Sequence, residues 1–150
     1  MPLLLTSSEE DNFQGRLIAD LEDIAPEAYA SRIKRPGVVD AWTYPPFREA
    51  AERFGRKKLI MAGLTNDVCT VYPAISATED GYEVQCVVDA GGSPTQVADE
   101  IAAQRMAKHG VQLTSTNQVM AELATDWASP TGKTIQRIMY EEILKPLIEG

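Results

Sequence analysis

The sequence is poor in the residues that mark disulfide-rich and metal-binding proteins. It contains two cysteines and one histidine in 150 residues. Two cysteines are too few for the disulfide framework of a small secreted domain, and no C-x-x-C pair or cysteine–histidine cluster offers four ligands to zinc. We therefore expect Cys69 and Cys86 to be reduced thiols in a cytoplasmic protein that binds no metal and no other cofactor.

Positive charge and long apolar runs are also scarce. Lysine and arginine number 14 against 22 acidic residues, which gives a formal net charge of −8. A chain without net cationic surface is poorly suited to a phosphate backbone, so nucleic acid is not an expected partner. The apolar runs are far shorter than the roughly 20 residues of a membrane span, and the opening "MPLLLTSSEED" lacks the basic segment of a signal peptide. No membrane partner is expected.

What the sequence does contain is an alternation of strand and helix patterns over the length of one domain, residues 1–150. Short apolar runs predict strands, and apolar residues spaced by three and four predict helices that end at glycines. The order predicts an α/β fold in which a mostly parallel sheet lies between helix layers. The predicted strands are 2–6, 57–63, 82–90 and 111–116; the predicted helices are 45–55, 67–81, 95–110, 117–128 and an amphipathic segment 132–150 interrupted at Pro146; 17–22 is a helical turn, and the chain between Pro26 and the RPG at 35–37 is loop-like.

Cys69 follows the predicted strand 57–63 and lies in the first turn of the predicted helix 67–81. Ligands of such sheets bind beyond the carboxyl ends of the strands, which is where this turn falls. With Thr65 or Asn66 as the cap, unpaired N–H groups and the helix dipole favour thiolate over thiol. A thiolate there could attack a carbonyl, and nearby N–H groups could hold the oxyanion. The alternative interpretation is a small buried apolar residue.

Three segments carry a resemblance to a known family. "AGLTNDVCTVYPAISATEDGYEVQCVVDA", residues 62–90, resembles the nucleophile segment of the isochorismatase-like cysteine hydrolases, in which a strand ends in glycine, a T-D/E-x-C turn opens a helix, and the next strand ends in V-x-DA. "RPGVVDAW", 35–42, resembles the segment with the family's basic catalytic residue, and "LLTSSEE", 4–10, resembles its second strand. The likeness covers nearly the whole chain and is nearest to an octameric branch of unknown substrate.

The resemblance implies a three-layer, Rossmann-like α-β-α fold and a set of site residues. Cys69 is the implied nucleophile, and the backbone N–H groups of Thr65 and Cys69 are the implied oxyanion hole, with a cis peptide bond between Leu64 and Thr65. Arg35 is the implied basic residue, and the adjacent Lys34 is the alternative. The implied reaction cleaves a small amide or related C–N bond through a thioester, without a cofactor, in a homo-oligomer that takes a small-molecule substrate.

The sequence departs from the family at its third catalytic residue. That residue is an aspartate at the end of the first sheet strand, and this chain matches the family from its second strand onward. A sheet without one central strand is therefore implied, in an N-terminally truncated domain with exposed strand edges that favour association. Loss of an acid–base group typically costs 10²- to 10⁴-fold in rate. The alternatives to an enzyme are an inactive oligomeric scaffold subunit and a thiol redox sensor.

No other carboxylate in the sequence is a clear substitute. Glu9, Glu10 and Asp11 are interpreted as a solvated acidic loop. Asp67 is interpreted as a favourable charge at a helix start. Asp89, at a strand end, either lines the cleft or bonds to turn amides.

The remaining candidates also have structural explanations. His109 ends a helix, where a cation meets the carbonyl end. Cys86 lies inside a strand and is interpreted as core. Trp42 and Tyr44 either line a pocket beside Arg35 or cover a subunit contact. The "GGSPT" stretch lacks the lysine and spacing of a phosphate-binding loop.

Overall fold

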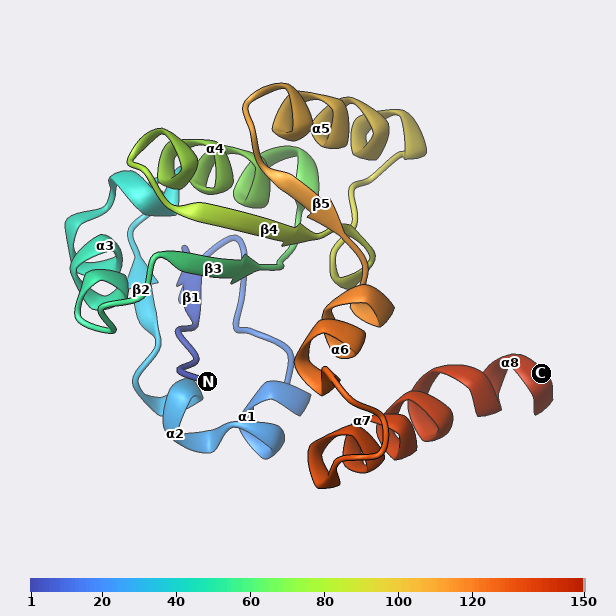
Figure 1. Cartoon of the computed structure of the whole chain (residues 1–150). Coiled ribbons are helices and arrows are strands. Elements are labelled where there is room, and N and C mark those ends of the chain that lie inside the picture. Colours follow the sequence, from blue (N-terminus) through green and yellow to red (C-terminus); the bar gives the residue numbers. More distant parts are fainter. Residues whose placement is uncertain (150) are drawn as a thin grey trace.

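The fold is an alternation of parallel strands and helices, seen in a computed structural model that describes residues 1–149 (Figure 1). The strands are β1 (Thr6–Ser8), β2 (Ile33–Arg35), β3 (Lys58–Met61), β4 (Glu83–Val87) and β5 (Gln112–Thr114). The α-helices are α1 (Asp20–Ile24), α2 (Pro26–Ala30), α3 (Pro45–Glu52), α4 (Val71–Glu79), α5 (Gln96–Lys108), α6 (Thr116–Ala124), α7 (Pro130–Met139) and α8 (Lys145–Glu149). Short 3₁₀ turns are η1 (Ala41–Thr43) and η3 (Val88–Ala90), and π turns are η2 (Asn66–Thr70) and η4 (Tyr140–Leu144).

The strands form two separate parallel sheets. β1 pairs with β2, and β3, β4 and β5 follow one another in the second sheet. Within residues 1–149, no strand pairing joins β1 to β3. The predicted α/β class with parallel strands is confirmed, and the interruption lies where the resemblance places a missing central strand.

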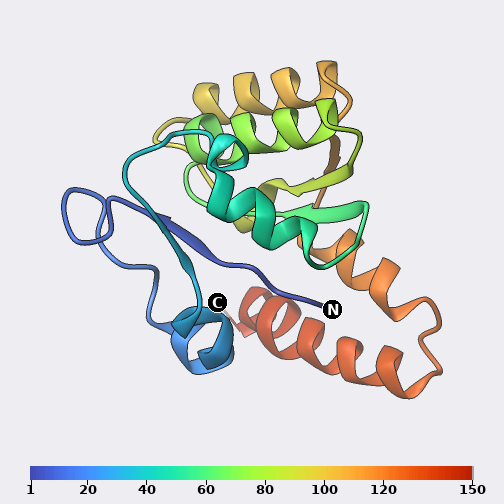
Figure 2. The same ribbon diagram turned by 90° about the vertical axis from the view of Figure 1, so that its left-hand side faces the viewer.

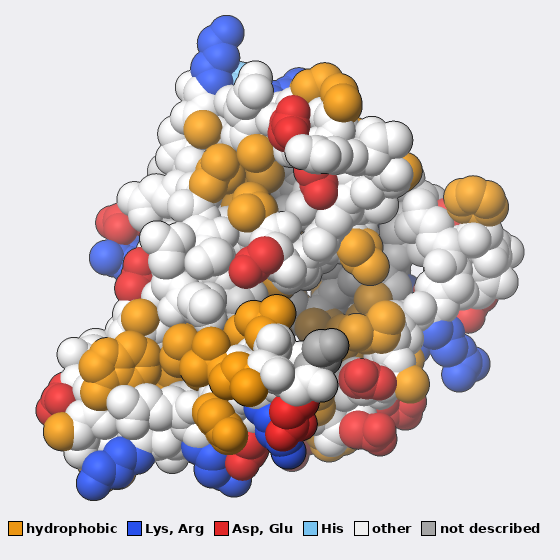
Figure 3. Space-filling view, turned by 90° about the vertical axis from the view of Figure 1, so that its right-hand side faces the viewer, with side chains coloured by type: hydrophobic (Ala, Val, Ile, Leu, Met, Phe, Trp, Pro, Cys, Tyr) orange, Lys and Arg blue, Asp and Glu red, His pale blue; other side chains and the backbone are white. Residues whose placement is uncertain are grey.

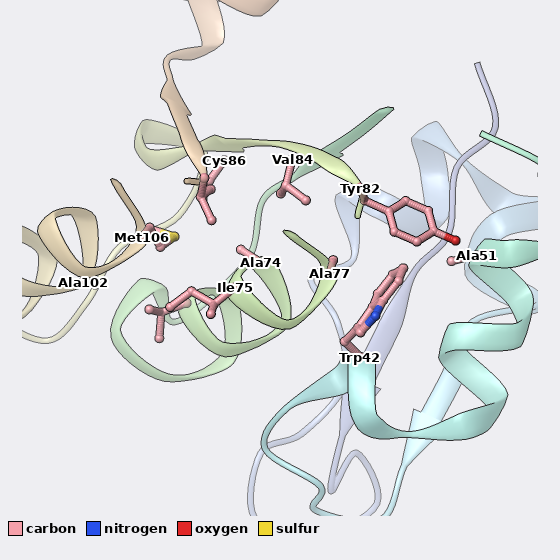
Figure 4. Close-up of a cluster of buried hydrophobic side chains, with 12 residues drawn as sticks. Trp42, Ala51, Ala74, Ile75, Ala77, Tyr82, Val84, Cys86, Ala102 and Met106 are labelled. Carbon is pink, nitrogen blue, oxygen red and sulfur yellow. The ribbon is translucent and has the colours of Figure 1, made fainter. Parts of the chain in front are cut away.

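The hydrophobic core lies between the three-stranded sheet and the helices α4 and α5 (Figure 4). Val84 and Cys86 are two residues apart on β4, so both side chains point to the same face, where they are almost completely buried. Trp42 of η1 extends this core toward α3, with its ring edge-on to Tyr82 at a centroid distance of 4.9 Å. Most of the burial that stabilises the fold is therefore concentrated on this one face.

Helices lie on both sides of the three-stranded sheet. In Figures 1 and 2, α4 and α5 lie above it and α7 and α8 lie below it. On the lower face, Gln85 of β4 donates to Glu122 of α6, while Ile60 of β3 is 41% exposed. Ile60 is therefore only partly covered on the lower face, whereas Val84 and Cys86 of the neighbouring strand are buried on the upper face.

The N-terminal third differs from the prediction in two places. The first strand is Thr6–Ser8 rather than residues 2–6, because Thr6, Ser7 and Ser8 pair with β2. The stretch predicted as a loop contains both α2 and β2. Pro26 is the first residue of α2, a position where the missing N–H of proline costs no helical hydrogen bond.

The C-terminal segment is helical through α7, η4 and α8. Pro146 lies in the first turn of α8, and the regular α-helical pattern gives way just before it, at η4. The interruption was predicted at Pro146, and it occurs on its N-terminal side because proline leaves a carbonyl of the preceding turn without its usual donor. None of the helices in the described part of the chain has the length and apolar character needed to cross a membrane.

Candidate active site

Cys69 lies in the turn that follows β3 and opens α4. The turn starts at Gly63, and the peptide bond between Leu64 and Thr65 is cis, as the resemblance predicted. Thr70 holds the turn closed, because its backbone N–H donates to Thr65 O at 3.0 Å and its hydroxyl donates to Gly63 O at 3.2 Å. Cys69 is half-buried and free. Its predicted position, at the carboxyl edge of the sheet and the start of a helix, is confirmed.

Arg35, the last residue of β2, is brought to Cys69 from the other sheet. Its side chain is buried, with Nε donating to Thr6 Oγ1 at 3.1 Å and Nη1 donating to the carbonyls of Val38 and Val39. Burial lowers the pKa of Arg35, and the nearness of Cys69 opposes this shift. The guanidinium remains positively charged at any physiological pH. The site therefore places a fixed cation beside a thiol.

Lys34 points away from this pair. Adjacent residues of a strand face opposite sides, so the side chain of Lys34 leaves β2 on the face opposite to that of Arg35. Its Nζ lies 2.9 Å from Glu10 Oε1 and 3.6 Å from Asp11 Oδ1. Of the two cations that the sequence left open, Arg35 is the one placed beside Cys69.

Glu10 is not part of a solvated loop, as the sequence had suggested. Its side chain is 1% exposed and accepts hydrogen bonds from Ser7 Oγ at 2.6 Å and from Arg32 Nε at 2.7 Å. The bonds from Arg32 hold the pKa of Glu10 far below its ordinary value. Glu10 therefore remains ionised near neutral pH, where it binds two cations and has no proton to give.

The carboxylates nearest to Cys69 in sequence have other surroundings. Asp67 is half-buried, its N–H donates to Ser93 Oγ at 3.1 Å, and its Oδ1 has no hydrogen-bond partner among the described residues. Asp89 Oδ1 accepts from the N–H and the hydroxyl of Thr116, at 2.7 and 3.0 Å. Of the two roles considered for Asp89, bonding to backbone amides is the one observed.

Three further candidates have structural roles. His109 follows the last residue of α5, at the opposite edge of the sheet from Cys69, with Nδ1 3.6 Å from Glu79 Oε1. Cys86 is fully buried, and burial raises the pKa of its thiol to about 11. Trp42 is 2% exposed and its Nε1 donates to Asp80 Oδ2 at 2.7 Å. The expectation that Trp42 lines a pocket or a subunit contact is wrong, because the ring belongs to the core.

A shallow cleft of about 240 Å³ opens next to Arg35. It is lined by Glu9, Glu10, Asp11, Asn12, Lys34, Arg35 and Pro36. Five of these seven side chains are charged, and Cys69 is not among the lining residues. Within residues 1–149, no three histidine, cysteine or acidic side chains are grouped so as to hold a metal ion.

Asn66 is a residue of the site that sequence reasoning considered only as a cap. It is 3% exposed, and its side chain does not cap the helix. Instead Nδ2 donates to Val88 O at 3.0 Å and to Asp99 Oδ1 at 3.3 Å. The glycine pair that follows β4, Gly91 and Gly92, lies against this side chain and the turn. In the sequence, the pair of adjacent glycines is the feature that indicates a close approach of this segment to the Cys69 turn.

The fold and the site define a class: an α/β protein with a cysteine at the carboxyl edge of a parallel sheet and an arginine beside it. The family model of the isochorismatase domain matches residues 9–118. The chain therefore belongs to the isochorismatase family.

The similar proteins include relatives named YcaC. The probable hydrolase YcaC of Escherichia coli is 36% identical over 127 residues, which cover 85% of this chain and 60% of that protein. This chain thus spans about three fifths of the length of this curated relative. The solved structure of that protein, described as an octameric hydrolase of unknown specificity, has a TM-score of 0.85 and 34% identity over 97% of this chain and 71% of its own.

A second solved structure is similar over the same extent. YcaC from Pseudomonas aeruginosa, with hexane-2,5-diol and covalent acrylamide, has a TM-score of 0.87 and is 36% identical, covering 97% of this chain and 72% of its own. The site described above therefore lies in a chain that is similar to these two proteins over almost its whole length.

Proposed function

We propose that this chain is a cysteine hydrolase that cleaves a small amide or related C–N bond, with Cys69 as the nucleophile. The observation that carries the proposal is the pairing of Cys69, at the start of a helix, with the buried guanidinium of Arg35. A cation and a helix start both stabilise a thiolate, which is the reactive form of cysteine. No cofactor takes part in the proposed reaction.

The first half of the proposed reaction forms a thioester. The Cys69 sulfur attacks the carbonyl carbon, a C–S bond forms, and the electron pair of the C=O bond moves to oxygen. The N–H groups of Thr65 and Cys69 hold this oxyanion. When it collapses, the C–N bond breaks and the nitrogen leaves with a proton, as ammonia or an amine. Water then attacks the thioester, which releases a carboxylic acid and the thiol.

Proton transfer to the leaving nitrogen needs an acid, which the family places on an aspartate at the end of a central strand. Glu10 is held ionised by Arg32, and Asp89 is engaged by Thr116. The interruption separates two sheets. On one side lies β1, which pairs with the strand of Arg35, and on the other side lies β3, which is followed by the turn of Cys69. We propose that full activity needs a carboxylate delivered at this interruption, and that the thioester forms slowly without it.

Covalent chemistry in a relative supports the nucleophile. The Pseudomonas aeruginosa YcaC structure contains covalent acrylamide. Acrylamide is an electrophile that thiolates attack, so we expect Cys69 of this chain to form the same kind of adduct. Cys86 is fully buried with a raised pKa of about 11, so it serves as an internal control that reacts only in unfolded chains.

The test is alkylation of the folded chain by acrylamide and by iodoacetamide, followed by mass spectrometry of peptides. We expect Cys69 to react at least about tenfold faster than free cysteine at neutral pH, with Cys86 unmodified. Replacing Arg35 by Met should lower the Cys69 rate by about tenfold, because the cation beside the sulfur is lost. The matched control is Lys34→Met on the same strand, which should leave the rate within about twofold.

Two outcomes would contradict the proposal. One is a Cys69 that reacts no faster than free cysteine, and the other is equal effects of Arg35→Met and Lys34→Met. Turnover is then tested with a panel of small primary amides by ammonia release, with Cys69→Ala as the inactive control.

We also propose that the chain forms a homo-oligomer in the cytoplasm. The Escherichia coli relative is octameric. In this chain, apolar side chains remain exposed on α7, η4 and α8: Ile138, Tyr140, Leu144, Leu147 and Ile148. Figure 3 shows hydrophobic side chains gathered on the lower half of one face of the molecule. Exposed apolar patches are typical of protein interfaces, and two free cysteines suit a reducing compartment.

An inactive subunit of such an oligomer is the second candidate. It is favoured by the interrupted sheet, because a family site without its central strand lacks one wall. This alternative predicts a stable assembly in which Cys69 can be alkylated. It also predicts that no amide is hydrolysed and that no added amide slows the alkylation of Cys69.

A further inference from the structure

We propose that Asn66 is a positioning residue that sets the geometry of the Cys69 turn, and that Gly91 is required because only glycine leaves room for the Asn66 side chain. The inference rests on the proposed function, since the geometry matters for the thiol and the two N–H groups of the turn. Neither Asn66 nor Gly91 is proposed to touch the substrate.

Asn66 ties the turn to two other elements at once. Its backbone N–H donates to Gly92 O at 2.9 Å, and its side-chain amide donates to Val88 O and to Asp99 Oδ1. These acceptors belong to the segment after β4 and to α5. A turn that is bonded only to itself could shift as a unit, whereas Asn66 fixes this one relative to the sheet edge and to a neighbouring helix.

Asn66 Oδ1 is the most informative atom of the contact. It is buried and has no hydrogen-bond partner among the described residues. Buried acceptors without partners are unusual and costly. The amide nonetheless keeps this orientation, which points both N–H bonds of Nδ2 at acceptors. The site thus leaves the buried Oδ1 without a hydrogen bond, while the two bonds of Nδ2 fix the position of residue 66, three residues before Cys69.

Gly91 is required for reasons of space, not of backbone conformation. Its φ of −146° and ψ of −157° are open to any residue. A Cβ at this position would nevertheless come closer than 3.0 Å to Asn66 Oδ1 and to Gly63 O. Gly63 begins the Cys69 turn, so a methyl group here would push on both ends of the segment that carries Thr65. Gly92, the next residue, has nothing within 4 Å of such a Cβ.

The two glycines therefore provide a matched pair of variants, Gly91→Ala and Gly92→Ala. The measured quantity is the iodoacetamide alkylation rate of Cys69 relative to wild type in the folded protein, with Cys86 as the simultaneous probe of unfolding. We expect Gly91→Ala to lower the Cys69 rate by about tenfold while Cys86 stays unmodified, because a displaced turn weakens the stabilisation of the thiolate. Gly92→Ala should stay within about twofold of wild type.

A second variant guards against a Gly91→Ala protein that does not fold. Asn66→Asp keeps the size of the side chain but turns a carboxylate oxygen toward Val88 O and the Asp99 carboxylate. Because these oxygens repel one another, we expect the alkylation rate of Cys69 to fall by a similar factor. Asp99→Asn removes that charge, and the double variant should recover part of the rate, which a merely structural loss of stability would not do.

An unchanged or increased Cys69 rate in Gly91→Ala and in Asn66→Asp overturns the inference. So does a fall that is matched by Gly92→Ala or accompanied by alkylation of Cys86, since either would reflect general loosening. The outcome is separable from that of the proposed function. If wild-type Cys69 reacts like free cysteine, the hydrolase proposal fails, whereas the rates of the variants relative to wild type still decide the role of Asn66.

Discussion

The two sheets of this protein are stabilised by different kinds of contact. The sheet of β3, β4 and β5 packs its upper face against α4 and α5, and the side chains between them are almost entirely hydrocarbon. The sheet of β1 and β2 has a buried carboxylate instead, Glu10, bonded to Arg32, Lys34 and Ser7. One half thus depends on apolar burial and the other on a charge cluster.

The candidate site lies where these two halves meet. Cys69 comes from the apolar half and Arg35 from the charged half. No strand pairing within residues 1–149 joins the halves, so their relative position depends on side-chain contacts. One such contact is the hydrogen bond from Ser76 of α4 to Asp40, at 2.6 Å. The comparison teaches that the site can be weakened from either side without touching Cys69 or Arg35.

The largest effect is expected from the apolar half. Met106 of α5 is 1% exposed in the core, and Met106→Ala should lower the free energy of unfolding by about 2–5 kcal/mol through lost burial and a cavity. Ile101 on the same helix is 60% exposed, and Ile101→Ala should change it by less than about 0.5 kcal/mol. Urea denaturation measures both, and equal effects would show that the core is not where the stability lies.

A smaller effect is expected from the charged half. Glu10→Gln removes the charge that two cations face, and it should lower the free energy of unfolding at pH 7 by about 1–3 kcal/mol. Asp11→Asn is the matched control, because Asp11 is 75% exposed and lies 3.6 Å from Lys34. We expect that control to change stability by less than about 0.5 kcal/mol.

The Glu10 effect should also depend on pH with a defined sign. The folded-state pKa of Glu10 lies below the unfolded value of about 4.3, so its contribution is fully present above that value and is lost as the pH falls below it. The stability difference between wild type and Glu10→Gln should therefore shrink between about pH 5 and pH 3. A difference that stays constant over this range would show that the charge is not the cause.

The smallest effect is expected at the contact between the halves. Ser76→Ala removes the hydrogen bond to Asp40 and should cost about 0.5–1.5 kcal/mol. Because the bond joins α4 to the segment after β2, a double-mutant cycle with Asp40→Asn should give a coupling energy of at least about 0.5 kcal/mol. Additive effects of the two changes would mean that this contact does not hold the halves together.

Much of the apolar half could be predicted from the sequence. The helix α3, the strands β3 to β5 and the position of Cys69 all follow from local patterns: apolar spacing, glycine stops and a strand that runs into a helix. The N-terminal third was harder, because α2 and β2 are each only a few residues long. Such short elements carry too little periodicity to be recognised, and they form because the rest of the chain supplies their partners.

The cation of the site shows where local patterns stop being sufficient. Lys34 and Arg35 are neighbours; the resemblance favoured Arg35 and kept Lys34 as the alternative, because a local pattern does not show which side chain faces Cys69. The pairing of β2 with β1 decides it, because a strand sends consecutive side chains to opposite faces. Glu10 then binds Lys34 on the other face, a contact that its place in an acidic run had argued against.

By itself, the sequence determined the class of fold, the family and the location of the thiol at a helix start, because these depend on spacings within a few residues. The tertiary structure decided between Arg35 and its alternative Lys34 as the cation beside that thiol, and it alone showed why Glu10 is buried and why Gly91 has to be a glycine. Each of these depends on a contact between two segments that are distant along the chain, and local sequence patterns do not predict such contacts.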